Sequence, residues 1–505
     1  MSDSTSLLSI RAKATPGPAP SGSGRGLFAT ADIRNCENIL HIQSPFVAVL
    51  DTARLDDTCS GCFGKRQLAS GPDYEIALKA CTGCQVVKYC DKTCQAKDWK
   101  FAHSRECAIF KNLKPKVLPI NARALLRVVL RVQAKKNAYT SGELDLFRTL
   151  ETHIRDLRDG SDGNDGKTQW ERVALTSKAI KTYSGTNIEE EVLSAYGAKL
   201  DVNSFNLTNA LYDRVGLYLH PYAALINHSC DYNAVAGFDG DELYVTAIRP
   251  IAKDEQITIS YVDTTYPTRT RQKELRERYF FTCTCSKCSQ AEDPEPTGKA
   301  AAVARDAFAL LESGNAGADL QKLLLMVQAL ISSKLPKTQQ PFVSILDEAI
   351  GAQIPDEYHH AFLESAIRFS RIDPTAYPNT SHPIRAVHAW TLAKLTVYIS
   401  QENPELAIPE FVKGGWQDFL GHGEVTLDYS LLAWTLLAEL HTKENEYATV
   451  PGFKAIVKKT FMEVHREFMG NGLDPRGLRN DIQREWAKFG KVVTAYWQCV
   501  MREEP

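Results

Sequence analysis

The feature that most constrains this chain is a group of three closely spaced cysteines, Cys283, Cys285 and Cys288, about fifty residues after Cys230. Structural Zn²⁺ binds four thiolate or imidazole ligands in a tetrahedron, so the group leaves one coordination position open. Cys230 can fill this position and would bring two distant segments of the chain together. The pair Asn227-His228, just before Cys230, would then be held beside the metal. A polar pair fixed in this way is typical of an active site.

A second group of metal-ligand residues lies upstream. Its eight members come in spaced pairs: Cys59-x2-Cys62, Cys81-x2-Cys84, Cys90-x3-Cys94 and His103-x3-Cys107. Eight ligands are enough for two tetrahedral zinc ions. RING-type ubiquitin ligase modules also use eight ligands, but they usually place a Cys-x-His step in the middle, and that step is missing here. The alternative without metal is a set of scattered buried cysteines and a surface histidine.

Cysteine usage and charge limit the class of protein. Of the 13 cysteines, only Cys36 and Cys499 lie outside these groups, and we expect both to be buried thiols. The chain begins without an apolar signal segment, and Cys-x2-Cys pairs in intracellular proteins bind metal more often than they form disulfides. The formal charge of −2 gives no overall attraction to nucleic acid or anionic membranes. No apolar run approaches the ~20 residues that span a bilayer. We therefore expect a soluble protein of the cytoplasm or nucleus without strong nucleic-acid binding.

The 505 residues leave room for several domains. The N-terminal segment, residues 1–21, is small, polar and rich in Pro and Gly, and is expected to be disordered. Apolar, β-branched runs predict strands at 39–42, 46–50, 243–248 and 256–261. Helical patterns cover 121–132 and 142–157. Two β-rich halves are therefore separated by the metal-ligand pairs and a helical insert, and long amphipathic helical patterns follow an acidic, proline-bearing linker after residue 290.

Four segments resemble the SET and post-SET regions of the SET-and-MYND protein lysine methyltransferases. They are Asn203-Ser204-Phe205, Ala224-Leu225-Ile226-Asn227-His228-Ser229-Cys230, Ile259-Ser260-Tyr261-Val262-Asp263 and Tyr279-Phe280-Phe281-Thr282-Cys283. The eight upstream ligands have the spacing of a MYND zinc module. The resemblance implies an α+β multidomain protein with a split SET domain (22–55 and 201–272), a MYND module (56–110), a helical insert (111–200), a post-SET zinc segment (273–290) and a C-terminal helical domain (291–505). That last domain is related to tetratricopeptide repeats in the family, but the sequence shows no regular period of about 34 residues.

The resemblance also implies which ligands share a metal ion. The MYND module would hold two interleaved zinc ions, and the post-SET segment a third. The three sets are Cys59, Cys62, Cys90 and Cys94; Cys81, Cys84, His103 and Cys107; and Cys230, Cys283, Cys285 and Cys288.

The implied reaction is methyl transfer from S-adenosylmethionine to the ε-amine of a protein lysine. A sulfonium already activates the methyl group, so the enzyme mainly has to align the reactants and deliver the amine uncharged. Burial in a narrow aromatic channel lowers the pKa of the lysine. By motif, Tyr279 would be the catalytic tyrosine, Tyr261 would supply a second hydroxyl, and Phe205 would form a wall of the channel.

Cofactor binding is expected to draw on several segments of the chain. The expected contacts are Ser23, Gly24, Arg25, His153, Asn227, His228, Tyr279 and Phe281. Glycines in the first of these segments permit close approach of the backbone to a ligand. The chain departs from the family in two places: Ser23 stands where relatives often carry Lys, and Asp231-Tyr232-Asn233 lacks the usual proline.

Two functions of different class remain open from the sequence. In the first, the protein is an active methyltransferase that modifies lysines of histone or non-histone proteins, and we expect it to be a monomer. In the second, the SET domain is catalytically silent and the protein is an adaptor in transcriptional regulation. Either protein could bind a proline-rich peptide if Trp99 of the MYND module is exposed, since extended proline-rich segments dock on flat aromatic faces. Packing of Trp99 against the second zinc site is the alternative.

Overall fold

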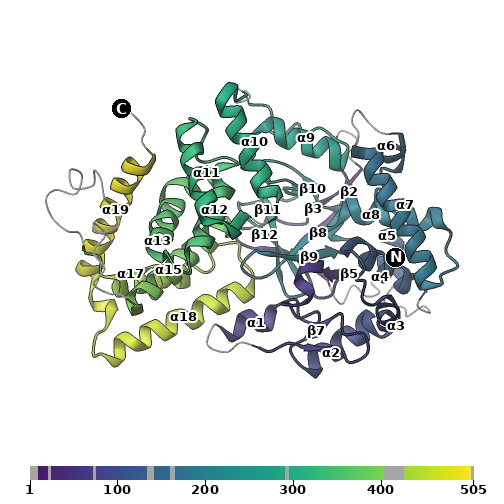
Figure 1. Ribbon diagram of the computed structural model, residues 1–505, viewed down its shortest axis with the longest axis horizontal. Coiled ribbons are helices and arrows are strands. Elements are labelled where there is room, and N and C mark those ends of the chain that lie inside the picture. Colours follow the sequence, from purple (N-terminus) through teal and green to yellow (C-terminus); the bar gives the residue numbers. More distant parts are fainter. Residues whose placement is uncertain are drawn as a thin grey trace. The chain divides into compact units, whose positions relative to one another are not determined.

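The computed structural model describes residues 10–20, 24–71, 76–133, 141–159, 165–290, 295–314, 316–402 and 426–501. The chain forms two compact units, and each is built from separate stretches of sequence. The first contains Met1–Val262, Gln272–Ser289 and Val450–Ile456. The second contains Asp263–Arg271, Gln290–Thr449 and Val457–Pro505. Figure 1 labels the elements of both units.

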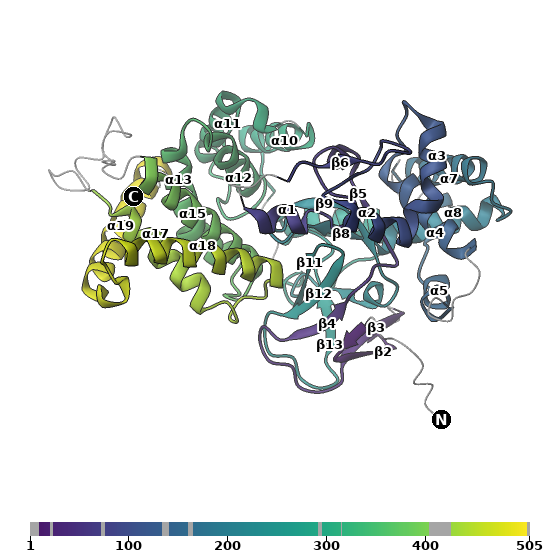
Figure 2. The same cartoon turned by 90° about the horizontal axis from the view of Figure 1, so that it is seen from below.

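Three small sheets form the β-rich core of the first unit. The first has the order β1-β4-β12-β11, made by Ile10–Ala12, Asn38–Ile42, Glu242–Ala247 and Ala234–Asp239. The second has the order β10-β13-β3-β2, made by Asn227–His228, Gln256–Ile259, Arg25–Ala29 and Ala14–Pro18. The third has the order β5-β9-β8, made by Val47–Leu50, Arg214–Leu219 and Phe205–Thr208. Each of these sheets therefore combines strands from before residue 51 with strands from after residue 204, and the predicted split β-rich domain is confirmed (Figure 2).

The prediction of a disordered segment over residues 1–21 is wrong for residues 10–18. These residues form β1 and β2, which lie at the edges of their sheets. Strand β2 pairs with β3 from Ala14 to Pro18, and Ala14 is buried. Prolines are tolerated in edge strands because one side of the strand needs no hydrogen-bond donor. Backbone pairing thus orders a segment that carries few large apolar side chains.

Short elements form the MYND module. They are α1 (Lys65–Ser70), β6 (Lys79–Ala80), β7 (Lys88–Tyr89), α2 (Lys92–Asp98), a π-helical turn (Trp99–His103) and α3 (Ser104–Leu113). Helix α2 begins after Asp91, whose carboxylate accepts hydrogen bonds from the N–H groups of Thr93 and Cys94. This cap fixes the start of the helix that carries Cys94.

Five helices form the insert: α4 (Ile120–Gln133), α5 (Ser141–Arg148), α6 (Ile154–Asp159), α7 (Asp165–Ser184) and α8 (Glu190–Asn203). The single helix predicted over 142–157 is wrong, because the chain breaks at residues 149–153. His153 has a left-handed φ of 49°. The Glu151 carboxylate accepts hydrogen bonds from the N–H groups of Thr152 and His153, and the His153 carbonyl accepts one from Leu157. Helix α6 therefore starts anew after this turn.

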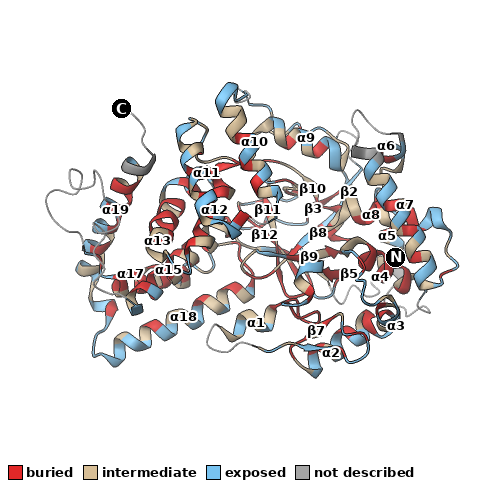
Figure 3. Ribbon diagram, in the orientation of Figure 1, coloured by how far each residue is buried: buried red, intermediate tan, exposed pale blue. Residues whose placement is uncertain are grey.

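The second unit is built from helices over its described residues. The longer ones are α10 (Gly298–Glu312), α11 (Leu320–Ser332), α12 (Phe342–Gln353), α13 (Tyr358–Ile367), α15 (Pro383–Glu402), α17 (Tyr429–Thr442), α18 (Pro451–Gly470), and α19 (Arg479–Met501). Residues 451–456 of α18 belong to the first unit. Buried and exposed residues alternate along several of them, as expected for amphipathic helices (Figure 3). The predicted C-terminal helical region is confirmed. Within the described ranges, no helix is both long and apolar enough to cross a membrane.

Candidate active site and zinc centres

The twelve predicted metal ligands come together in the three predicted sets. In each set the four ligand atoms lie within 4.8 Å of one another. The sets are Cys59, Cys62, Cys90 and Cys94; Cys81, Cys84, His103 and Cys107; and Cys230, Cys283, Cys285 and Cys288. A tetrahedral zinc ion with Zn–S bonds of about 2.3 Å places two sulfurs about 3.8 Å apart. The Sγ atoms of Cys62 and Cys90 are 3.8 Å apart, as are those of Cys81 and Cys107. Ligand type and spacing therefore fit Zn²⁺.

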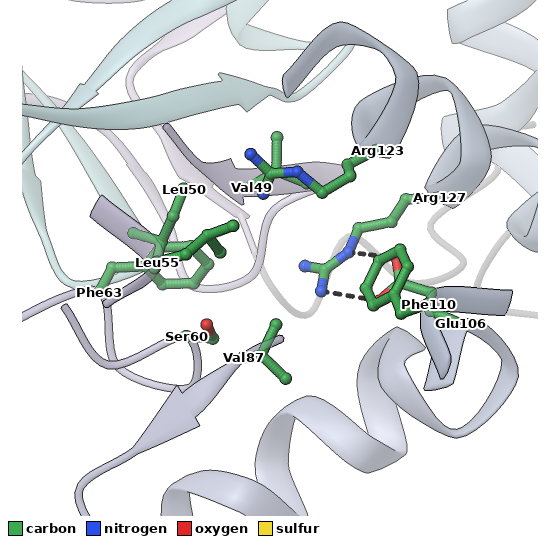
Figure 4. Close-up of a pocket in the computed structure, with 10 residues that line it drawn as sticks. All are labelled: Val49, Leu50, Leu55, Ser60, Phe63, Val87, Glu106, Phe110, Arg123 and Arg127. Atoms are coloured by element: carbon green, nitrogen blue, oxygen red, sulfur yellow. Dashed lines mark hydrogen bonds and ion pairs between the residues drawn. The ribbon is translucent and has the colours of Figure 1, made fainter. Parts of the chain in front are cut away.

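A buried ionic network joins the MYND module to the rest of the first unit. Arg127 on α4 donates from Nε to Glu106 Oε1 at 2.7 Å, and from Nη2 to Asp98 Oδ1 at 3.1 Å. Its Nη1 donates to the Ala48 carbonyl in β5 at 2.6 Å. Arg127 and Glu106 line a cavity of about 10 Å³, close to the size of one water molecule, together with Ser60 (Figure 4). One guanidinium thus links α2, α3 and β5.

Of the two cysteines outside the metal sets, Cys36 differs from the sequence expectation and Cys499 stays untested. Cys36 is only half-buried and has a left-handed φ of 60°, because it lies in a turn before β4 rather than in a strand. Cys499 lies in α19, and its burial falls outside the described side chains.

The pair Asn227-His228 lies at the post-SET zinc set. Strand β10 pairs in parallel with β13, which places His228 opposite Ile259. His228 Nδ1 accepts a hydrogen bond from the backbone N–H of Tyr261 at 2.9 Å, so the ring proton is assigned to Nε2. Nε2 lies 3.2 Å from Cys230 Sγ and is oriented to donate to this thiolate. A single imidazole therefore connects a metal ligand to the segment of Tyr261.

The segment after Cys230 lacks the proline common in the family and is held by side-chain hydrogen bonds. Asn233 is buried, and its side chain makes hydrogen bonds to the backbone of β13. Its Oδ1 accepts from the N–H of Thr258 at 2.8 Å, and its Nδ2 donates to the carbonyl of Gln256 at 2.8 Å. Asp231 accepts a hydrogen bond from Ser286 near the cysteine group. The departure in sequence thus leaves the edge of the zinc site connected.

Three aromatic side chains pack on the post-SET ligands. Tyr261, Tyr279 and Phe281 lie against the small apolar cluster that contains Cys230 and Cys283. The rings of Tyr261 and Tyr279 have centroids 4.9 Å apart, and those of Tyr261 and Phe281 are 6.5 Å apart. The Tyr261 hydroxyl donates to the Ile226 carbonyl at 2.5 Å. The zinc set therefore supports both predicted catalytic tyrosines.

Both tyrosine hydroxyls stay protonated at neutral pH. Burial raises the pKa of Tyr261, and the neighbouring Tyr279 raises it further. Burial also raises the pKa of Tyr279, which the Arg278 guanidinium, 5.4 Å from the ring, partly opposes. A neutral hydroxyl can donate or accept a hydrogen bond but is a weak base. These side chains are therefore suited to orienting an amine rather than deprotonating it.

The predicted cofactor residues fall into two groups. Gly24, Arg25 and Asn227 meet, because the Asn227 side chain donates to the Arg25 carbonyl at 3.1 Å. A Cβ at Gly26 would lie 2.3 Å from Gln256 Nε2, so a side chain there would require the Gln256 amide to move, whereas Gly24 has a φ of 71° and open space around its Cβ position. His153 contacts the loop of the tyrosines through Phe280, with ring centroids 5.0 Å apart. It precedes α6 rather than lying on a helix, as noted above.

Two predicted residues are not joined to this group. Ser23 lies outside the described residues. Phe205 is half-buried at the start of β8 and packs against the large apolar core, as Tyr261 does. Among the residues that the structure describes, no ring contact links Phe205 to Tyr261 or Tyr279. Its role as a channel wall stays a prediction.

Sequence reasoning missed the buried cations, among them Arg127 and Lys199. A signal was available: both interrupt apolar runs of helices, Arg127 between Leu126 and Val128, and Lys199 between Ala198 and Leu200. A charged residue on an apolar helical face is buried only where hydrogen bonds or an ion pair compensate its charge.

Comparison with known proteins agrees with this geometry. Residues 24–262 match the family model described as SET domain. Histone-lysine N-methyltransferase SMYD3 of Mus musculus is 30% identical over 389 residues, which cover 74% of this chain and 86% of the relative. SET domain and MYND-type zinc finger protein 6 of Schizosaccharomyces pombe is 30% identical over 275 residues, covering 54% of this chain and 52% of the relative. N-lysine methyltransferase SMYD2 of Gallus gallus is 27% identical over 296 residues, covering 56% of this chain and 63% of the relative. The chain belongs to the SET-and-MYND family of protein-lysine methyltransferases.

Proposed function

We propose that this chain transfers a methyl group from S-adenosylmethionine to the ε-amine of a lysine in a protein substrate, histone or non-histone. The observation that carries the proposal is the packing of Tyr261, Tyr279 and Phe281 on the post-SET zinc ligands, beside Asn227 and His228. Two of the relatives named above are a histone-lysine and an N-lysine methyltransferase, which supports the same reaction.

The residues at the start of β3 and at β10 suit the cofactor. When bound, S-adenosylmethionine supplies a methyl group that its sulfonium has already activated. Gly24 is exposed and leaves the backbone accessible to a ligand. The Asn227 amide uses its N–H on the Arg25 carbonyl, and over the described residues its Oδ1 accepts no hydrogen bond. This oxygen can therefore accept from the ammonium group of an amino acid.

The two tyrosines have different tasks in the transfer. The Tyr261 proton is committed to the Ile226 carbonyl, so its oxygen is left to accept an N–H of the substrate amine. Accepting that N–H would turn the nitrogen lone pair away from Tyr261. The Tyr279 hydroxyl makes no hydrogen bond within the described part of the chain and is available to the substrate. Surrounding aromatic rings exclude water from the lysine and disfavour its ammonium form.

Zinc in the third set acts by holding these residues in place. The set joins residues 230 and 283–288, which flank both tyrosines in sequence. The two ring nitrogens of His228 contact Cys230 on one side and the backbone of Tyr261 on the other. Outer-shell hydrogen bonds of this kind orient metal ligands. The metal therefore organises the site without touching the reactants.

A proline-rich peptide is the proposed partner of the MYND module. Trp99 is 45% exposed, and one side of it contacts His103 with ring centroids 5.8 Å apart. It borders a groove of about 400 Å³ that Lys92 and Gln95 also line. An open aromatic face flanked by polar groups suits a preformed polyproline helix. Trp99→Ala in the full chain should abolish binding of a polyproline peptide in calorimetry without loss of zinc, and zinc release would instead show that the tryptophan is structural.

Methyl incorporation tests the proposed reaction against the silent adaptor. The purified chain is incubated with methyl-labelled S-adenosylmethionine, mixed histones and whole-cell extract. We expect labelled protein with the wild type and little with Tyr279→Phe. Absence of label, with the cofactor bound in calorimetry and a polyproline peptide bound at the MYND module, would favour the adaptor instead.

A further inference from the structure

Lys199 is a buried lysine whose ammonium group donates hydrogen bonds to backbone carbonyls. It lies on α8 and is 6% exposed. Its Nζ donates to the Arg148 carbonyl at 3.1 Å and to the Leu150 carbonyl. No ion pair of Lys199 occurs among the described residues, and burial lowers its pKa. The acceptors lie at the C-terminal end of α5, where helices leave carbonyl groups unpaired and favour a positive charge.

Asn203, one helical turn after Lys199 on α8, makes hydrogen bonds to the same region of the chain. Its Nδ2 donates to the Glu151 carbonyl at 2.9 Å and to the Lys199 carbonyl at 2.8 Å. The Glu151 side chain in turn accepts hydrogen bonds from the N–H groups of Thr152 and His153, just before α6. The end of α8 therefore fixes both the beginning and the middle of residues 149–153, here called the 149–153 turn.

The 149–153 turn contacts the two segments expected to bind the cofactor. Thr149 Oγ1 accepts a hydrogen bond from Arg25 Nη2 at 2.6 Å, and Arg25 lies between Gly24 and Gly26. At the other end of the turn, the His153 ring packs on Phe280, the residue between Tyr279 and Phe281. His153 has a left-handed backbone at this end of the turn, with a φ of 49°. The turn thus bridges both sides of the proposed cofactor site.

We infer that Lys199 and Asn203 are positioning residues for the cofactor: by holding the carbonyls of the 149–153 turn, they place Thr149 against Arg25 and His153 against Phe280. The inference rests on the proposed function and deepens it. Neither side chain touches the reacting atoms, so their loss should weaken cofactor binding more than the rate of transfer. A merely structural role would instead lower stability without a selective change in affinity.

Lys199→Met tests the inference because methionine keeps the buried stem and removes the charge. Calorimetry with S-adenosylmethionine should show a Kd raised about tenfold or more, since two charge-assisted hydrogen bonds to the turn are lost. The kcat at saturating cofactor should stay within about twofold. Lys178→Met, on the exposed face of α7, is the matched control and should bind as the wild type does.

A double-mutant cycle separates action through the turn from general damage. If Lys199 acts through His153, the effects of Lys199→Met and His153→Ala on the Kd should be strongly non-additive. Asn203→Ala, a milder change at a half-buried position, should give the same affinity loss and faster hydrogen exchange at residues 149–154. Unchanged affinity in Lys199→Met and Asn203→Ala, or strict additivity with His153→Ala, would overturn the inference. Failure of the wild type to bind S-adenosylmethionine would overturn the proposed function and this inference with it.

Discussion

Replacing Arg127 by methionine should lower the free energy of opening of the MYND module. The change keeps the apolar stem of the side chain and removes a guanidinium that is almost fully buried. Two carboxylates then lose their cation: Glu106, which is 0% exposed, and Asp98, which is 4% exposed. Asp98 keeps a hydrogen bond from the Tyr89 hydroxyl at 2.8 Å, and Glu106 keeps only His103, with 3.7 Å between Nδ1 and Oε2.

Removing one partner of a buried ion pair typically costs about 3–5 kcal/mol, because a charge stays buried without compensation. The lost bond to the Ala48 carbonyl adds to this cost. We therefore expect the free energy of opening of the MYND module to fall by about 3–5 kcal/mol. Native-state hydrogen exchange of amides in residues 88–110 measures this quantity locally, so it does not require the whole chain to unfold in one step.

Two further variants make the argument specific. In the triple variant Asp98→Asn, Glu106→Gln and Arg127→Met all three charges of this network are removed, and we expect it to recover about 2 kcal/mol of the loss. Arg131→Met removes a cation from the same helix that pairs with Glu143 in the insert, and should leave exchange at residues 88–110 unchanged. A loss below about 1 kcal/mol in Arg127→Met, or a triple variant no more stable than the single one, would refute the reasoning.

The other predictions concern metal and site residues. Elemental analysis should return three zinc ions per chain, and one or none would contradict the assignment. Cys285→Ser should reduce activity more than Cys59→Ser, because only Cys285 belongs to the set beside the tyrosines. Tyr279→Phe should lower turnover and leave the Kd for the cofactor nearly unchanged, whereas Asn227→Ala should weaken cofactor binding first; equal affinity losses in calorimetry would count against these roles. His228→Asn keeps an acceptor near the Nδ1 position but loses the donor to the thiolate, so it should release zinc to a chelator faster than the wild type. An unchanged release rate would argue against the hydrogen bond from His228 to Cys230.

Ligand spacing predicted all three metal sets because coordination allows few arrangements. Four donors must surround one ion, so closely spaced pairs and a single distant cysteine restrict how the chain can fold. The same reasoning located Asn227 and His228 beside the third set. Apolar, β-branched runs located β4, β5, β12 and β13 of the split core, but they did not locate β8, β9 or β11.

What the sequence could not show depends on contacts between distant residues. The strands at 10–18 form because β3 and β4 offer open edges, which a local pattern of small residues and prolines does not reveal. The break at 149–153 depends on Lys199 and Asn203, which lie about fifty residues away. The partners of Arg127 likewise come from three separate elements. Such polar contacts carry no periodic signal.

Amino-acid analysis of the methylated product tests the central claim most directly. Protein labelled by the chain with methyl-labelled S-adenosylmethionine is hydrolysed, and the label is assigned to individual amino acids. We expect the label to lie in ε-N-methyllysine, and we expect the amount of label incorporated to fall sharply with Tyr279→Phe. Label in another amino acid, or incorporation that is the same in Tyr279→Phe, would contradict a lysine methyltransferase site built on Tyr261 and Tyr279.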